Sequence, residues 1–141
     1  SSDLFLRKKI VDNLYIFFDK LLIPNNIIAF IIKSGHFHYP MYSLIFILLL
    51  PLPLAFFQLF ICICSFIFYI YFDGCILTIL EYKLNNKKDD IHIIDFLLYA
   101  LQYDITNENR INVTLILSGY YFILVFFILW IRTINYKKKL I

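Results

Sequence analysis

The sequence predicts an all-α integral membrane protein, with two transmembrane helices and amphipathic helices at the membrane surface. Residues 41–72 form an apolar run of 32 residues without a single charge, and residues 111–131 form a second uncharged run. A transmembrane helix needs about 20 apolar residues. The chain is 62% hydrophobic, whereas a soluble domain has roughly 45–50% apolar residues. One membrane domain over residues 1–141 is therefore expected.

The first run is too long for one upright helix, because 32 residues would extend roughly 48 Å. Pro51 and Pro53 interrupt it. We expect one long helix over residues 41–72, kinked at these prolines and tilted in the bilayer. The alternative is a hairpin of two helices that turns at the prolines. It is disfavoured because a turn without polar side chains would leave backbone groups unpaired in lipid.

Amphipathic segments flank the apolar runs. Residues 4–22 repeat apolar side chains at three- and four-residue spacing and carry basic residues off that stripe, which predicts an interfacial helix. Residues 75–103 predict amphipathic helices on the outer surface, with Asp90 as a cap and an exposed polar face that contains His92 and Asp95. Thr106 is the expected N-cap of the last helix.

The charge distribution predicts the orientation of the chain. Residues 1–33 carry five basic and three acidic residues, residues 73–110 carry four and seven, and the tail, residues 132–141, carries four basic residues. Short basic segments stay on the cytoplasmic or matrix side of a membrane. Both termini are therefore expected on that side. The basic tail predicts an anchor beside anionic phospholipid, with no nucleic-acid partner.

Each apolar run contains a stripe of polar or small residues at helical spacing. Such residues let two helices approach closely and form hydrogen bonds across their interface. We expect the two stripes to form the seam between the transmembrane helices. The predicted helix-packing residues are Gln58, Cys62 and Ser65 in the first run and Thr114, Ser118 and Gly119 in the second.

A ligand-binding interpretation depends on a few polar residues near the first run. His36, His38, Gln58 and Tyr69 are candidates for contacting a quinone, a lipid or a haem. No ionisable residue lies deep in either run, which argues against a proton relay or a charged-substrate transporter. The spacing of Cys62 and Cys64 points their side chains apart on a helix. The sequence predicts no catalytic residue, no metal site and no cofactor.

A short stretch directly after the first run, Cys75-Ile76-Leu77-Thr78-Ile79-Leu80-Glu81, resembles a family of small multi-span membrane proteins with a Cys-x-Leu-Thr-x-x-Glu stretch. The similarity covers about residues 55–131. The chain departs from the family pattern at Ile76, where that family tends to have proline, and lacks the family's glycine-rich stretch before the last helix. That family has no agreed activity, so the resemblance implies a topology and marks Cys75, Thr78 and Glu81 as residues to probe.

These features favour a non-catalytic accessory subunit of a larger membrane complex, with other membrane subunits and phospholipid as partners. Abundant Ile, Phe, Tyr, Asn and Lys indicate an AT-rich genome. The expected setting is a respiratory or ATP-synthase assembly in the mitochondrial inner membrane of a protist, and the alternative is a viral or other endomembrane. The other functional interpretation is a ligand-binding or redox membrane subunit. A membrane enzyme that uses Cys75 or Glu81 is the least favoured.

Overall fold

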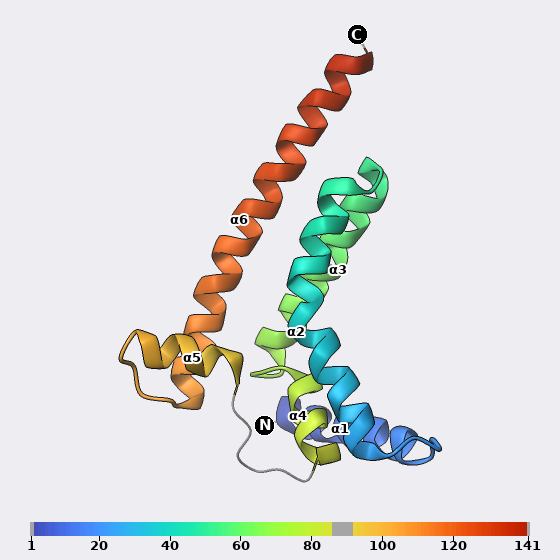
Figure 1. Cartoon of the computed structure of the whole chain (residues 1–141), viewed down its shortest axis with the longest axis vertical. Helices are drawn as coiled ribbons and strands as arrows, with labels where there is room; N and C mark the ends of the chain where they lie inside the picture. The colour runs from blue at the N-terminus through green and yellow to red at the C-terminus, as the bar shows by residue number, and fades with distance from the viewer. Residues whose placement is uncertain (1, 86–91, 141) are drawn as a thin grey trace. The chain divides into compact units, whose positions relative to one another are not determined.

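The computed structural model describes residues 2–85 and 92–140, and every regular element in these ranges is an α-helix (Figure 1). Charge-free stretches and amphipathic stretches both form helices, as the apolar spacing predicts. The elements are α1 (Ser2–Asp19), α2 (Asn25–Leu49), α3 (Leu52–Tyr71), α4 (Ile76–Asn85), α5 (Ile93–Ala100) and α6 (Asn107–Leu140). The all-α prediction is confirmed for the described residues.

The helices form two compact units, each with its own buried cluster. The first unit comprises Ser1–Tyr39 and Ile67–Ile91, and the second comprises Pro40–Phe66 and His92–Ile141. Helices α2 and α3 each contribute one end to each unit. The expectation of a single membrane domain over residues 1–141 stays a prediction.

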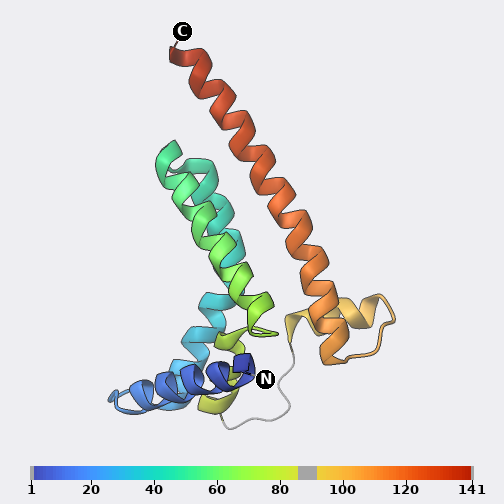
Figure 2. The same cartoon turned by 180° about the vertical axis from the view of Figure 1, so that it is seen from behind.

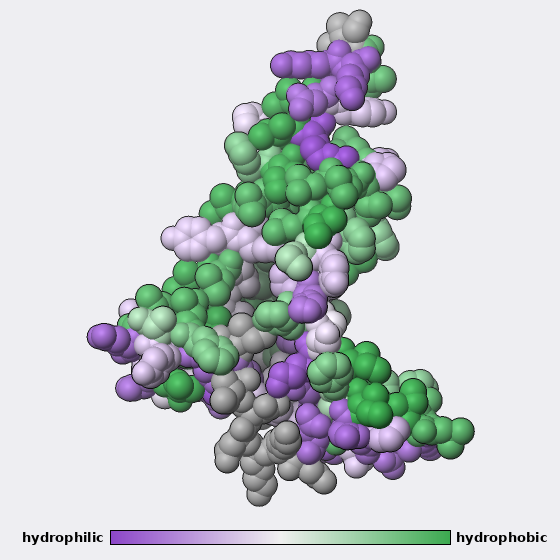
Figure 3. Space-filling view, viewed as in Figure 1, coloured by the Kyte–Doolittle hydropathy of each residue, from purple (hydrophilic) through white to green (hydrophobic). Residues whose placement is uncertain are grey.

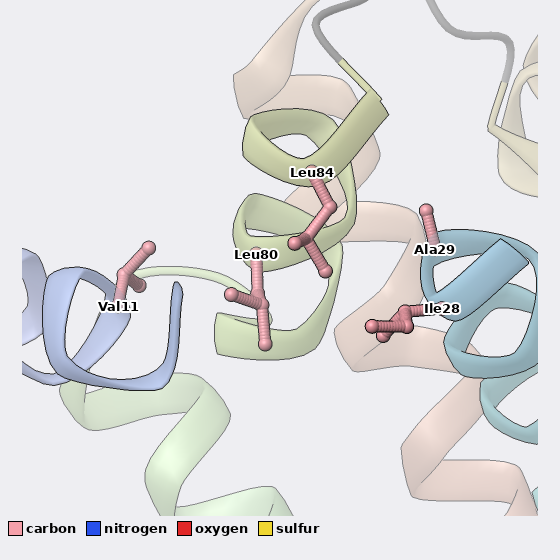
Figure 4. Packing of buried hydrophobic residues seen from close by; sticks show 5 residues of the cluster. All are labelled: Val11, Ile28, Ala29, Leu80 and Leu84. Atoms are coloured by element: carbon pink, nitrogen blue, oxygen red, sulfur yellow. The ribbon is translucent and has the colours of Figure 1, made fainter. Parts of the chain in front are cut away.

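Helix α4 forms the centre of the first unit. Its Leu80 and Leu84 lie between Val11 of α1 and the pair Ile28 and Ala29 of α2, as Figure 4 shows. All five side chains are less than a tenth exposed. Because α4 has only 10 residues, and isolated helices shorter than about 12 are marginal in water, its helical structure depends on this packing from both sides.

A left-handed turn connects α3 to α4. Asp73 and Gly74 have φ angles of 53° and 137°, and the Gly74 N–H donates to the main-chain oxygen of Tyr69. This closure of a helix end by a left-handed residue is common. Arg7 of α1 donates to the main-chain oxygen of Phe72 at 2.9 Å, so α1 is attached to the same turn.

The prediction of one kinked helix over residues 41–72 is wrong. Helix α2 ends at Leu49 and α3 begins at Leu52. Residues 40–49 and 52–66 run antiparallel as a hairpin (Figures 1 and 2). Pro51 and Pro53 fit the start of α3, because the first turn of a helix has no acceptor for the N–H that proline lacks.

The objection to a hairpin was its unpaired backbone groups, and Arg132 of α6 removes that objection. Its guanidinium donates to the main-chain oxygens of Ile47, in the last turn of α2, and of Leu50, which directly follows α2. Helix ends leave such carbonyls without a helical partner. The main-chain oxygen of Leu50 thus receives its hydrogen bond from a side chain 82 residues further along the chain. The sequence around the prolines does not indicate this contact.

Helix α6 starts as predicted. The Thr106 hydroxyl accepts a hydrogen bond from the Asn109 N–H at 3.2 Å, and Glu108 lies in the first turn, where an acid is favoured by the helix dipole. The prediction of Asp90 as the cap of the preceding helix is wrong: the N-cap of α5 is His92, whose main-chain N–H donates to the Asp95 carboxylate at 3.0 Å, and Asp90 itself lies outside the described residues. The prediction that Asp95 is exposed is wrong, because Asp95 is 6% exposed and binds Arg110 through both oxygens at 2.7 and 2.8 Å.

Helices α3 and α6 are the two that are long and apolar enough to cross a membrane among the described residues. Only 17% of the apolar window of α3 and 11% of that of α6 are buried inside the protein. Figure 3 shows hydrophobic residues over most of the length of α6 and hydrophilic residues at its C-terminal end. The second predicted transmembrane run, residues 111–131, lies wholly within α6.

Candidate thiol–imidazole site

The strongest chemical cluster lies in the first unit, where α2 and α4 run antiparallel beside each other. Cys75 immediately precedes α4 and His36 lies on α2, and the Cys75 Sγ is 3.2 Å from the His36 Nε2. The buried contacts of Ile28 and Ala29 with Leu84 hold the two helices together further along. Packing of apolar residues therefore positions a thiol next to an imidazole.

The start of α4 adds two more hydrogen-bond donors to the thiol. Both the main-chain N–H and the hydroxyl of Thr78 hydrogen-bond to the Cys75 sulfur. Thr78 is the third residue of α4, so its N–H is one of those that have no partner within the helix. Cys75 thus occupies the position at which a capping side chain receives this N–H.

These contacts change the acidity of the thiol. Burial opposes ionisation of Cys75, but the hydrogen bonds from His36 and Thr78 outweigh it, so that the pKa of the thiol falls below its ordinary value. Thiolates are the nucleophilic form of cysteine, and a neighbouring imidazole together with a helix N-terminus is an arrangement that favours them. Cys75 is half-buried, so the sulfur remains accessible.

Glu81 lies one turn beyond Thr78 on α4 and is 4% exposed. Its carboxylate is 3.6 Å from the ammonium group of Lys33 on α2. A buried carboxylate needs such a partner, because burying an unpaired charge is costly. The Lys33–Glu81 pair is thus a second polar link between the helices that carry His36 and Cys75.

The motif Cys75, Thr78 and Glu81 falls on one side of the start of α4, since residues three apart share a helix face. The structure adds His36, a residue predicted as a ligand candidate, to this motif. His38 contacts Phe37, with ring centroids 4.8 Å apart. In the described ranges no three His, Cys, Asp or Glu side chains lie close enough together to bind a metal ion.

The polar residues of the first apolar run contact α2. Ser43 is fully buried, and its hydroxyl lies 3.0 Å from the Cys62 Sγ and 3.1 Å from the Gln58 Nε2, which donates to it. Ser65 donates to the main-chain oxygen of Ile61 within its own helix. Tyr69 is half-buried and belongs to the first unit.

The predicted seam residues of α6 have no contact that supports a close helix approach. Gly119 is exposed, and no described atom lies within 4 Å of a Cβ built on it. Thr114 and Ser118 are half-buried. The contacts of α6 with the hairpin come instead from Val125 and Leu129. A seam of small residues on α6 therefore stays a prediction.

Sequence reasoning missed three residues that hold the second unit together, namely Ser43, Arg110 and Arg132. Ser43 follows a histidine- and tyrosine-containing stretch, and its burial gives no sequence signal. Arg110 and Arg132 stand at the two ends of the uncharged run of α6. An arginine at the end of an apolar run is ordinarily explained by the aqueous boundary, which conceals its role as a hydrogen-bond donor to another helix.

Comparison with known proteins adds no identity to this geometry: no family model, no curated protein and no solved structure matches the chain.

Proposed function

We propose that the chain is a membrane-embedded structural subunit that packs with other membrane subunits and with phospholipid. The observation that carries the proposal is the exposure of the apolar helices. Of the apolar windows of α3 and α6, 17% and 11% are buried. An apolar surface this large is expected to contact lipid or another protein, because monomeric soluble proteins rarely expose contiguous apolar patches beyond a few hundred Å².

The polar contacts within the second unit support a structural role. Ser43 binds Gln58 and Cys62 in the hairpin, and Arg132 binds the end of α2. Hydrogen bonds between helices of this kind stabilise helix association in a membrane. Gln58, one of the predicted ligand candidates, thus contributes to packing.

Aromatic side chains on α6 favour protein partners in addition to lipid. Phe127 and Trp130 are 53% and 60% exposed and lie near the C-terminal end of the apolar run. Aromatic residues are enriched where protein surfaces meet, and Trp is also enriched at membrane interfaces. We propose that this part of α6 contacts a neighbouring subunit close to the membrane surface.

The setting we propose is the mitochondrial inner membrane, in a respiratory or ATP-synthase assembly, with a viral or other endomembrane as the alternative. The support is compositional: Ile, Phe, Tyr, Asn and Lys dominate the chain.

The contacts of the second unit favour a topology that differs from the expected one. Tyr121 donates to the main-chain oxygen of Pro40, the rings of Phe66 and Phe122 are 5.2 Å apart, and Arg132 binds the turn after Leu49. Helix α6 therefore runs parallel to α2 and antiparallel to α3. With α3 and α6 as antiparallel spans, we propose that the turn before α3 and the basic tail share one membrane face.

Native purification in mild detergent, followed by mass spectrometry, tests the proposed role. Stoichiometric recovery of the chain with a larger membrane complex is the expected result, and the identity of that complex would name the process. Recovery of the chain alone, or with only a small molecule, would contradict a structural role and favour a ligand-binding subunit.

A further inference from the structure

The Cys75 thiol differs from the two other cysteines in its surroundings. Cys62 is buried and contacts the Ser43 hydroxyl inside the hairpin, and Cys64 lies within α3. Cys75 is half-buried, lies outside any helix, and contacts an imidazole nitrogen at 3.2 Å. The described structure thus prepares one of its three thiols for reaction as a nucleophile.

Large, exposed apolar side chains stand close to this site along the sequence. Cys75 lies four residues after Tyr71, the last residue of α3, and two before Leu77. Tyr71, Leu77 and Phe37, which follows His36, are 50%, 43% and 50% exposed. Exposed aromatic and aliphatic side chains of this kind suit contact with a hydrocarbon chain. Cysteines directly beside a membrane helix are the usual positions of reversible fatty acylation.

We propose that Cys75 is an S-acylation site, which accepts a long-chain fatty acyl group from an acyl-coenzyme A with the help of His36. The inference depends on the proposed membrane location but not on the proposed partners. It concerns a covalent modification of the subunit, in which His36 acts as a positioning and proton-accepting group.

The reaction balances without an oxidant or a reductant. The Cys75 thiol gives its proton to the His36 imidazole, and the resulting thiolate attacks the carbonyl carbon of the acyl thioester. The bond between that carbon and the coenzyme A sulfur breaks. The coenzyme A thiolate leaves with the electron pair and takes up the proton from His36. One thioester is consumed and one is formed.

Thr78 assists by stabilising the thiolate. Its N–H and hydroxyl both favour the ionised form of the thiol and lower its pKa, and hydrogen bonds to an ionised acceptor are stronger than those between neutral groups. Lys33 and Glu81 hold α2 and α4 at the distance that brings His36 to Cys75. Cys75, Thr78 and Glu81 therefore all contribute to acylation of the thiol: Cys75 as the nucleophile, Thr78 by stabilising the thiolate, and Glu81 by positioning α4 against α2.

The test uses the full chain in nanodiscs of phosphatidylcholine, incubated with palmitoyl-coenzyme A. Intact-mass spectrometry measures the addition, neutral hydroxylamine tests for a thioester, and peptide mapping locates it. The expected result is one hydroxylamine-sensitive palmitoyl group on Cys75. Cys62→Ser and Cys64→Ser serve as matched controls that retain the label, and Cys75→Ser abolishes it.

The His36→Gln variant separates a chemical role from a structural one. Its acylation rate at neutral pH is expected to fall by roughly a hundredfold, because a positioned proton-accepting group contributes at least about that much to such a step. The rate should recover as the pH rises, because the thiol then ionises without the imidazole. A rate that is reduced equally at every pH would contradict the role of His36.

Equal labelling of Cys62 or Cys64, or no label in wild-type protein that has entered the nanodiscs, would overturn the proposal. Peptide mapping of the wild type needs no variant, so a misfolded Cys75→Ser would not obscure the answer. Failure of the chain to enter nanodiscs would contradict the proposed membrane location, and it would overturn the acylation proposal as well.

Discussion

The guanidinium of Arg132 donates a hydrogen bond to the main-chain oxygen of Leu50, which attaches α6 to the turn between α2 and α3. A second bond from the same guanidinium reaches Ile47. The two carbonyls lie at the C-terminal end of α2, directly before α3. This contact explains how a Pro-Leu-Pro turn without polar side chains is tolerated between two apolar helices.

Replacing Arg132 by alanine should destabilise the protein by roughly 2 kcal/mol, because two carbonyls lose charged donors. Unfolding in detergent by titration with a denaturing surfactant, followed by circular dichroism, measures the change. Lys138→Ala removes an exposed charge from the same helix and should leave stability within about 0.5 kcal/mol. Equal effects of the two substitutions would show that the Arg132 contact adds nothing specific.

Ser43 and Gln58 should show coupled effects on stability. Ser43→Ala removes the acceptor of the Gln58 amide and should cost about 1 kcal/mol. Adding Gln58→Leu removes the amide itself, so the double variant should be more stable than the sum of the single changes predicts. Ser65→Ala is the control, since its hydroxyl bonds within its own helix. Strict additivity would contradict a direct Ser43–Gln58 bond.

The link between α5 and α6 should weaken in acid. The hydrogen bonds of Arg110 lower the pKa of Asp95 below its ordinary value of 3.8. A lowered carboxyl pKa stabilises the folded state above that ordinary value, and the stabilisation disappears as the pH falls through the lowered pKa. Hydrogen exchange of the α5 amides, normalised for intrinsic rates, should therefore accelerate below about pH 4.

Asp95→Asn should destabilise the packing of α5 on α6 by about 2 kcal/mol already at neutral pH. The acceleration of α5 hydrogen exchange below about pH 4, called the acid transition here, should then disappear. Glu108→Gln, which changes an exposed acid in the first turn of α6, should keep the transition. An acid transition that persists unchanged in Asp95→Asn would assign it to another group.

The proposed topology makes a prediction for labelling in sealed vesicles. Single cysteines placed at Pro51 and at Lys138, in a background without native cysteines, should react with a membrane-impermeant maleimide from the same face. Reaction of Pro51→Cys and Lys138→Cys from opposite faces would contradict antiparallel spans α3 and α6.

Local signals in the sequence predicted the helical class of the chain and the Thr106 cap. The apolar run ending before Arg132 and the hydroxyl of Thr106 defined most of α6, since hydropathy and capping act over a few residues. The hairpin was considered but disfavoured, because its decisive contact, from Arg132 to Leu50, joins residues far apart in the sequence. Asp95 was placed on an exposed face for the same reason, because its partner Arg110 follows after a turn.

The candidate site was half predictable. A short motif marked Cys75, Thr78 and Glu81 as residues to probe, and His36 was noted separately as a ligand candidate. Their meeting depends on α2 and α4 packing antiparallel through buried apolar residues. Periodicity indicates which face of a helix is apolar, but it does not say which other helix covers that face.

The most direct test of the proposed structural role is photo-crosslinking in native membranes. Benzoylphenylalanine at Phe127 or Trp130, two exposed aromatic positions of α6, should give a discrete adduct with another membrane protein. The same probe at Lys138, in the hydrophilic tail, serves as the comparison. Adducts with lipid alone at both aromatic positions would contradict the account, because α6 would then face only the bilayer.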